Sequence, residues 1–391
     1  MMQLPATLPR RIAALLIFVL FAIAIVSTAR LEGQAASSPK RRSDTALRQA
    51  VSANMSAKEL RQQARKIALT DPLHAVGFFL QVMALDLEKA PSVDNRRVLI
   101  AEASRRQPSF TAPRIWLVAD DIRNERFAKA IDGADTVMRL NGEFRKLLVP
   151  ILAPLLANDA VYPLLQKKLG SFPIWRTELL SEAIKSGEYN DRVERLLRAN
   201  APPRYAAAMS VERSAYLNGL VAQGAPVRAI TVWKSFAPKQ NYAAIFDGDF
   251  KAKNPVQPFA WSYASDDYSY SEKVVTADSG EVLVRAHHGG DGKIALLTQL
   301  VALKTGTNLL SITMRDGGLA MPETFFWRLR CFDAQDAFAS QSLGKLAADW
   351  QTMQMRITVP ETDCALQYLS LEAEDNDGDE AEIEVRKVEV R

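Results

Sequence analysis

Residues 383–390 read Ile-Glu-Val-Arg-Lys-Val-Glu-Val, and this stretch decides the fold of the C-terminal part of the chain. Apolar and charged side chains alternate along it, which is the pattern of a strand with one buried and one solvated face. Short runs rich in β-forming residues recur upstream at 282–286, 294–301, 309–314, 325–330, 353–359 and 366–371. About eight strands follow from these runs. We therefore expect an antiparallel β-sandwich of the jelly-roll type over residues 241–391.

Both cysteines of the chain, Cys331 and Cys364, fall in this β-patterned block. Such a pair forms a disulfide when the domain lies in an oxidising compartment, whereas a cytosolic body would hold two thiols with no partner motif. We predict a Cys331–Cys364 disulfide and a body outside the cytoplasm. Two unrelated buried thiols are the alternative.

An apolar segment near the N-terminus supports that location. Arg10 and Arg11 precede 18 residues without a charge, up to Arg30. About 20 apolar residues span a bilayer as a helix, and a signal peptide has a shorter apolar core of ~7–15 residues. We therefore expect a transmembrane anchor at 10–30, after a short cytoplasmic tail at 1–9 and before a flexible linker at 31–45. A signal peptide is the alternative, since Ser27 and Ala29 suit a signal peptidase.

The charge is divided unevenly along the chain, although its net value is +4. Residues 40–240 contain 32 Lys and Arg against 20 Asp and Glu, whereas residues 241–391 contain 14 against 24. The change coincides with the change of apolar pattern, so we expect a helical repeat domain at 46–238 and the sandwich at 241–391. The basic half has no arginine-rich tract or nucleic-acid reader motif. Its expected partners are anionic lipid, acidic glycan or the acidic sandwich, not nucleic acid.

Helical periodicity dominates the basic half. Apolar residues recur at three- and four-residue spacing, as in Leu60, Ala64 and Ile67, which places them on one helix face. The stretches 71–79, 124–131 and 224–233 each put a polar turn before an alanine-bearing amphipathic helix. They resemble degenerate tetratricopeptide repeats, whose stacked helix pairs form a solenoid with a concave surface for a protein partner. A generic α-solenoid or a helix bundle is the alternative.

A second resemblance lies in the β-patterned block. Asp247-Gly248-Asp249-Phe250 is followed by Pro258-Phe259-Ala260-Trp261, which is similar to the opening strand of jelly-roll carbohydrate-binding modules. In that family an acidic residue after the first phenylalanine helps to hold a structural calcium ion, whereas this chain has Lys251 there. The resemblance implies a glycan-binding fold. Because Lys251 departs from the family pattern, our hypothesis is that an ion pair from Lys251 to Glu384 or Glu382 replaces the calcium ion.

Candidate metal ligands lie near the C-terminus. Asp375, Asp377 and Asp379 alternate around Gly378, as oxygen ligands do in a calcium loop. The residues that follow alternate like a strand and no helices flank the segment, so a solvated acidic hairpin turn is the preferred interpretation. Structural calcium at these three aspartates is the alternative.

The glycine-rich segment 287–292 predicts a second hairpin, between the runs at 282–286 and 294–301. Its adjacent residues His287 and His288 point to opposite faces of a strand, so they do not chelate a metal together. The acidic half offers no unique carboxylate pair, and the sequence has no phosphate-binding loop or nucleophile motif. We therefore assign no catalytic residue, no enzyme activity and no cofactor.

Aromatic residues are the candidate ligand contacts, because rings stack on sugar faces. Trp261 and Trp327 are assigned to the core. The polar segment after Trp261 is the predicted glycan platform, with these residues: Asp266, Asp267, Tyr268 and Tyr270.

The complete layout is similar to that of periplasmic proteins of Gram-negative bacteria associated with exopolysaccharide or envelope-glycan systems. We expect a non-enzymatic scaffold or adaptor, anchored in the inner membrane by a single pass, with its N-terminus cytoplasmic and its body periplasmic. The helical repeats would bind a protein partner, and the sandwich would contact envelope polysaccharide. A glycan-processing enzyme or its accessory subunit is one alternative, and a purely structural envelope protein is another.

Overall fold

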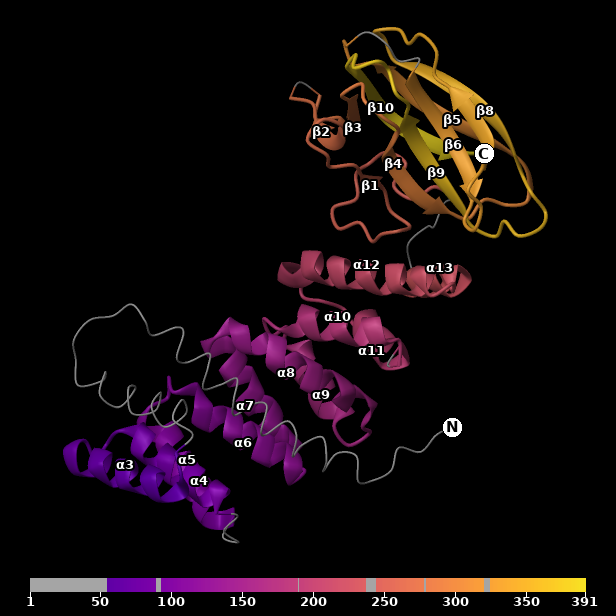
Figure 1. Cartoon of the computed structure of the whole chain (residues 1–391). Helices are drawn as coiled ribbons and strands as arrows, with labels where there is room; N and C mark the ends of the chain where they lie inside the picture. The colour runs from indigo at the N-terminus through magenta and orange to yellow at the C-terminus, as the bar shows by residue number, and fades with distance from the viewer. Residues whose placement is uncertain (1–54, 89–92, 189, 237–243, 278, 320–323) are drawn as a thin grey trace. The chain divides into compact units, whose positions relative to one another are not determined.

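A computed structural model of the chain describes residues 55–88, 93–188, 190–236, 244–277, 279–319 and 324–391 (Figure 1). Within these residues eleven α-helices precede ten β-strands, so the fold is α+β. The chain divides into two compact units, Met1–Tyr189 and Asn190–Arg391. The predicted tail, anchor and linker at 1–45 lie outside the described residues. Among the helices that are described, none combines the length and apolar character needed to cross a bilayer.

The described part of the first unit is helical. Its α-helices are α3 (Ala57–Thr70), α4 (Ala75–Leu87), α5 (Val93–Arg106), α6 (Thr111–Arg123), α7 (Phe127–Leu140), α8 (Arg145–Leu152), α9 (Tyr162–Gly170) and α10 (Arg176–Ser186). Short 3₁₀ helices at Gly142–Phe144 and Ala153–Ala157 flank α8. From α3 to α7, each helix packs against the next one in sequence. This order keeps most of the contacts local in the chain.

Helix α3 shows how sequence sets these elements. It begins with a capping box, in which the Ser56 hydroxyl accepts a hydrogen bond from Glu59 N and the Glu59 carboxylate accepts one from Ser56 N. Its residues Leu60, Ala64 and Ile67 are buried in one cluster with the apolar face of α4. The helix therefore has one buried face and one solvent face.

Two adjacent carboxylates are buried inside the first unit. Asp120 and Asp121 of α6 each pair with Arg97 of α5 and with Arg126, which precedes α7. A buried charge is tolerated when it is paired and hydrogen-bonded. These four residues therefore join three consecutive helices.

The three segments predicted as a turn followed by a helix have that local structure. Helices α4, α7 and α13 (Pro226–Phe236) begin after the turns at 71–74, 124–126 and 223–225. This confirms the local prediction. The relationship to tetratricopeptide repeats stays a prediction.

In the described part of the second unit, three helices precede the sandwich. The helices are α11 (Asn190–Arg198), α12 (Ala206–Ala222) and α13, with a 3₁₀ turn at Pro203–Tyr205. The strands are β1 (Ser262–Tyr263), β2 (Tyr270–Val275), β3 (Val282–His288), β4 (Ile294–Val301), β5 (Gly306–Asp316), β6 (Phe325–Cys331), β7 (Ala337–Ser342), β8 (Gln351–Val359), β9 (Gln367–Ala373) and β10 (Ala381–Val390).

The strands form two antiparallel five-stranded sheets. The first sheet has the order β1-β4-β9-β6-β7, and the second has the order β2-β3-β10-β5-β8. Their inner faces bury one apolar cluster, which includes Phe250, Trp261 and Trp327. The prediction of an antiparallel β-sandwich is confirmed, and so is the assignment of both tryptophans to its core.

The segment 247–250 has a structural role in this sandwich. Trp261 Nε1 donates a hydrogen bond to Asp247 O at 3.1 Å, and the rings of Trp261 and Phe250 lie 5.6 Å apart between centroids. Gly248 lies against the backbone of β10, because a Cβ placed on it would meet Val388 O at 2.0 Å. Glycine is therefore required at this position by close backbone approach.

Three predictions in this region are wrong. The segments 287–292 and 375–380 are not hairpin turns, because each connects strands of different sheets, β3 to β4 and β9 to β10. Lys251 does not pair with Glu384 or Glu382; its Nζ lies 3.0 Å from Asp249 Oδ2. Lys251 and Asp249 are both exposed and lie in the same loop, whereas the two glutamates are engaged by arginines of the second sheet.

Candidate functional site

The central strand of the second sheet, β10, directs acidic side chains outward. Ile383 and Val385 are fully buried in the core, and the alternation places Glu382 and Glu384 on the outer face. Glu384 is nevertheless mostly buried. The register explains this, because Arg285 of β3 and Arg315 of β5 lie opposite Glu384 on its two sides.

Ion pairs connect these side chains across four strands. Arg315 Nη2 lies 2.6 Å from Glu384 Oε2, and Arg285 Nη2 lies 3.3 Å from Glu384 Oε1. Arg285 also approaches Glu382 at 3.5 Å and Glu272 of β2 at 3.6 Å. The result is a row of alternating charge that crosses β2, β3, β10 and β5.

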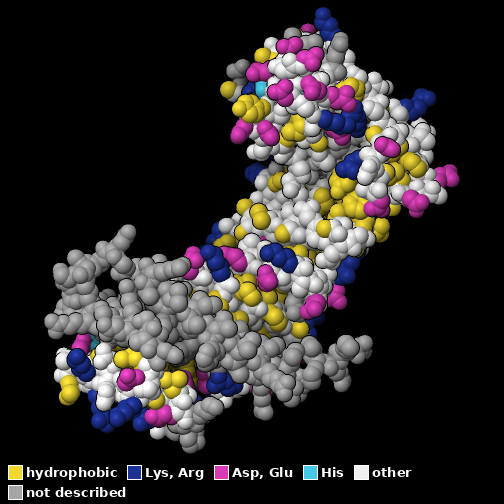
Figure 2. Space-filling model, viewed as in Figure 1, with side chains coloured by type: hydrophobic (Ala, Val, Ile, Leu, Met, Phe, Trp, Pro, Cys, Tyr) yellow, Lys and Arg dark blue, Asp and Glu magenta, His cyan; other side chains and the backbone are white. Residues whose placement is uncertain are grey.

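Aromatic rings border this row. Tyr270 stacks on His287 with 5.0 Å between ring centroids, and His287 Nδ1 lies 3.8 Å from a carboxylate oxygen of Glu382. At the other end, the guanidinium carbons of Arg315 and Arg386 lie 4.6 and 4.8 Å from the ring centroid of Trp350. We call this set the charged face: Tyr270, Glu272, Arg285, His287, Arg315, Trp350, Glu382 and Glu384. In the space-filling view, acidic and basic side chains mix over the part of the sandwich that holds β2 and β3 (Figure 2).

The polar groups of the charged face contact one another closely. Burial raises the pKa of Glu382, and the nearby charges of Arg285 and His287 oppose this shift only in part. Arg285 Nε and His287 Nδ1 are buried, and each faces a carboxylate oxygen of Glu382, at 3.5 and 3.8 Å, without a hydrogen bond in the described part of the chain. Carboxylates accept hydrogen bonds, guanidinium groups donate them in parallel pairs, and aromatic rings cover apolar faces. Together these groups can bind a polyhydroxylated molecule.

The residues of the predicted glycan platform lie in two places in the structure. Tyr268 is 77% exposed in the loop between β1 and β2, with Asp266 and Asp267 exposed beside it. Asp266 Oδ1 accepts a hydrogen bond from Tyr268 N at 3.1 Å, which shapes the loop. Tyr270 is half-buried on β2 and belongs to the charged face. The loop therefore adjoins that face through Tyr270.

Sequence reasoning missed most of the charged face. Arg285 and Arg315 were not candidates, and Glu382 and Glu384 were considered as partners of Lys251. The alternation in 383–390 already placed Glu384 on the solvated side of a strand, and this signal could have selected it. The arginines that surround it come from strands whose register was unknown.

The two adjacent histidines do lie on opposite sides of β3. His287 faces Tyr270 and Glu382, whereas His288 is fully buried with its Nδ1 3.0 Å from Ser269 Oγ. Burial lowers the pKa of His288. His288 therefore supports the loop that carries Tyr268.

The three aspartates considered for calcium form a turn. Asp375 Oδ1 accepts a hydrogen bond from Asp377 N at 3.1 Å, and Asp379 N donates one to Asn376 O at 3.0 Å. Asp377 has φ 53° and Gly378 has φ 84°, as a tight turn requires. Within the described part of the chain, no three His, Cys, Asp or Glu side chains come together in a way that could hold a metal ion.

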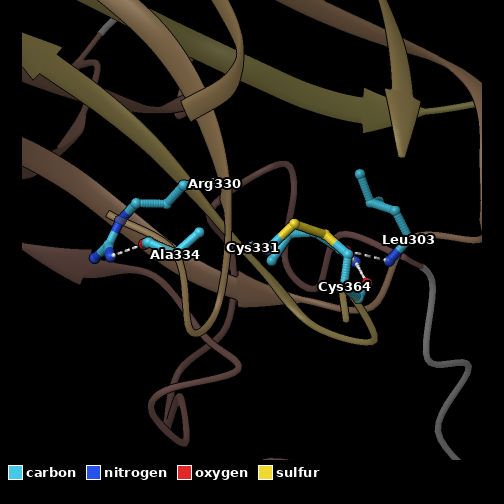
Figure 3. The surroundings of a disulfide bond; sticks show 6 residues. Leu303, Arg330, Cys331, Ala334 and Cys364 are labelled. Atoms are coloured by element: carbon cyan, nitrogen blue, oxygen red, sulfur yellow. Dashed lines mark hydrogen bonds between the residues drawn. A yellow bond between two sulfur atoms is a disulfide. The ribbon is translucent and has the colours of Figure 1, made fainter. Parts of the chain in front are cut away.

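Cys331 and Cys364 are joined by a disulfide, as predicted (Figure 3). Cys331 ends β6, and Cys364 lies in the segment before β9. Next to the disulfide, Gln367 donates a hydrogen bond to Cys364 O, and its Oε1 accepts one from Leu303 N at 2.8 Å. The disulfide and Gln367 therefore fasten one end of the first sheet.

The outer face of the first sheet is a second polar surface. There Arg328 pairs with both Glu372 and Glu374, and its guanidinium lies 4.6 Å from the ring centroid of Phe326. Arg330 lies 4.6 Å from the ring centroid of Tyr368. We call this set the arginine face: Phe326, Arg328, Arg330, Tyr368, Glu372 and Glu374.

Comparisons with known proteins define what the sandwich is similar to. No protein-family model matches the chain, and no curated protein matches it. A solved structure described as "CBM4 structure and function" is 19% identical with a TM-score of 0.28, over 37% of this chain and 97% of that one. A cyclase from Fischerella sp. TAU in complex with 4-(1H-indol-3-yl)butan-2-one is 13% identical with a TM-score of 0.29, over 39% and 97%.

Another similar structure contains the CBM22-1 and GH10 modules of Clostridium thermocellum xylanase 10B with xylohexaose. It is 15% identical with a TM-score of 0.27, over 39% of this chain and 29% of that one. At such identities and TM-scores the likeness carries no argument about what this protein binds.

Proposed function

We propose that this protein is a membrane-tethered, non-enzymatic scaffold whose sandwich binds glycan through the charged face. The N-terminal segment would hold the body on the periplasmic side of the inner membrane. The helices, as tetratricopeptide-like repeats, would bind a protein partner, and the jelly-roll sandwich would contact exopolysaccharide or another envelope glycan. The main observation behind this proposal is the charged face, where ordered donors, acceptors and aromatic rings lie together on the outside of one sheet.

The arrangement of the charged face suits recognition better than catalysis. Glu384 is engaged by two arginines, and Arg285 is shared by three glutamates. Such pairs fix the side chains in position, so little conformational entropy is lost when a ligand binds. Vicinal hydroxyl groups of a sugar match the parallel geometry of guanidinium and carboxylate groups. The exposed ring of Tyr268 adds a surface for stacking.

Glycan binding by the full-length protein in detergent tests the proposal. Affinity electrophoresis against a panel of polysaccharides should retard the wild type. Tyr270→Ala should weaken the retardation about tenfold, since a stacked ring contributes about 1.5 kcal/mol. Phe326→Ala is the matched control, because Phe326 is also half-buried but lies on the arginine face. Equal loss in both variants would contradict a site on the charged face.

The same samples separate the alternatives. Release of reducing ends from a retained polysaccharide would support a glycan-processing enzyme. Neither retention nor release across the panel would support a purely structural envelope protein and would contradict the proposed function.

A further inference from the structure

The solvent face of α3 carries a regular stripe. Lys58, Gln62, Arg65 and Leu69 follow one another at spacings of four, three and four residues, which places them on one side of a helix. The buried residues Leu60, Ala64 and Ile67 occupy the opposite side. The stripe therefore points away from the core of the first unit.

This stripe continues into two exposed leucines. Leu69 is 86% exposed at the end of α3, and Leu73 is 70% exposed in the following turn. Lys66 lies beside the stripe and is also exposed. We call this set the α3 surface: Lys58, Gln62, Arg65, Lys66, Leu69 and Leu73. It combines apolar side chains with basic ones at one edge of the unit.

The cations of this surface are not neutralised by the fold. Lys58, Arg65 and Lys66 form no ion pair with any residue that the structure describes, whereas Arg61 nearby pairs with Glu88. The carboxylate of Glu59 accepts hydrogen bonds from Ser56. Figure 2 shows basic and hydrophobic side chains, with some acidic ones among them, at the end of the first unit that α3 and α4 form.

We propose that the α3 surface binds the surface of an anionic phospholipid bilayer. Basic side chains near an anionic leaflet each gain roughly fivefold in partitioning, and leucines at the same level bury apolar area among the headgroups. Long Lys and Arg side chains keep their charges in the headgroup layer while their stems lie along apolar surface. A single partner, the anionic bilayer, would therefore contact both the basic and the apolar side chains of the α3 surface.

The position of α3 in the chain favours this partner. Only 26 residues separate the predicted anchor from Ala57, so the α3 surface lies within about 90 Å of the membrane even when that segment is fully extended. A tether of this length makes binding effectively intramolecular, so weak intrinsic affinity suffices. The inference rests on the tether of the proposed function and is independent of glycan binding.

A fluorescent label on the stripe tests the proposal. Both native cysteines are in the disulfide, so Gln62→Cys supplies a single thiol without removing a leucine or a cation. The full-length labelled protein is reconstituted into vesicles of phosphatidylcholine alone or with phosphatidylglycerol, each containing brominated lipid as a quencher. Ile174→Cys, labelled in the same way, is the control at another exposed site of the first unit.

We expect quenching at position 62 in the anionic vesicles, little in phosphatidylcholine, and none at position 174 in either. Adding Lys58→Gln, Arg65→Gln and Lys66→Gln to the labelled protein should weaken the contact on the order of a hundredfold and abolish the quenching. Leu69→Ala with Leu73→Ala should reduce it. Quenching at position 62 that equals position 174, or that survives loss of the three cations, would overturn the proposal.

Flotation of the same vesicles in 1 M salt separates the two proposals. Salt screens the α3 contact and leaves an apolar anchor in place. Protein that fails to float there lacks the tether, which counts against the proposed function, whereas the quenching experiment reports on the α3 surface alone.

Discussion

The two outer faces of the sandwich use the same residue types with the charges exchanged. On the charged face one carboxylate, Glu384, is shared by Arg285 and Arg315. On the arginine face one guanidinium, Arg328, is shared by Glu372 and Glu374. Each central group is largely buried by its partners, and each face stacks arginines on aromatic rings.

The exchange of charges decides which groups lose their partner when the central residue of a face is replaced. Loss of Glu384 leaves two cations without their common partner, whereas loss of Arg328 leaves two anions. A buried charge that loses its partner costs far more than an exposed pair contributes. The faces should therefore respond differently to substitution and to pH.

The largest effect should come from the disulfide, which supports only the sheet that carries the arginine face. Replacing both cysteines, Cys331→Ala with Cys364→Ala, should lower the free energy of unfolding of the sandwich by about 3–4 kcal/mol, because the crosslink closes a loop of 33 residues. Urea unfolding followed by tryptophan fluorescence measures this. A reductant should destabilise the wild type and leave the double variant unchanged. Equal stability of wild type and double variant would contradict the prediction.

Removing the two central groups tests the comparison directly. Glu384→Gln should lower the free energy of unfolding by about 2–3 kcal/mol, because two guanidinium groups lose a buried partner. Arg328→Gln should cost less, about 1–2 kcal/mol, since the side chain of Glu374 is 42% exposed and can turn to water. Urea unfolding of both variants shows which one loses more free energy of unfolding.

The peripheral pair of Arg386 and Glu281 supplies the control for these two variants. It is more exposed than either central group, so Glu281→Gln should change stability by less than about 0.5 kcal/mol. A larger loss for Arg328→Gln than for Glu384→Gln would reverse the comparison.

The smallest effect should be a difference in pH dependence. Burial alone raises the pKa of Glu372, but hydrogen bonds from Arg328 and Ser370 outweigh it and hold the pKa below its usual 4.5. Glu372 therefore adds stability above pH 4.5, and this stability is lost as the pH falls through the lowered pKa. On the charged face the pKa of Glu382 is raised, so its contribution changes in the opposite direction: stability falls as the pH rises from 4.5 through the raised pKa.

Unfolding free energies between pH 3 and 7 test both signs. Glu372→Gln should flatten the acid-side loss of stability, and Glu382→Gln should steepen it. Parallel curves for the two variants would show that the faces do not differ in this respect.

Much of the sandwich could be predicted from local pattern. The apolar pattern identified β3 to β6 and β8 to β10, but not β1, β2 or β7. Trp261 and Trp327 were assigned to the core because tryptophans of a sandwich are usually buried there. The same pattern failed at 287–292 and 375–380, because Gly290 and Gly378 supply the positive φ of a turn whether the chain returns to its own sheet or crosses to the other. Turn chemistry therefore does not determine which strands pair.

The candidate site depended on pairing that sequence alone does not give. Tyr270 was a candidate because it lies among polar and aromatic residues that are adjacent in sequence. Glu384 meets Arg285 and Arg315 across separations of 99 and 69 residues, and a shift of one residue in either register would turn the arginines into the core. Local spacing carries no information about such contacts.

The place of β10 has a consequence for biosynthesis. This strand is made after all the others, yet it occupies the middle of its sheet, between β3 and β5. While it is still inside the ribosome or a translocation channel, β3 and β5 each lack a hydrogen-bonding partner on one side. An emerging chain therefore exposes two open strand edges, which are sites for incorrect association.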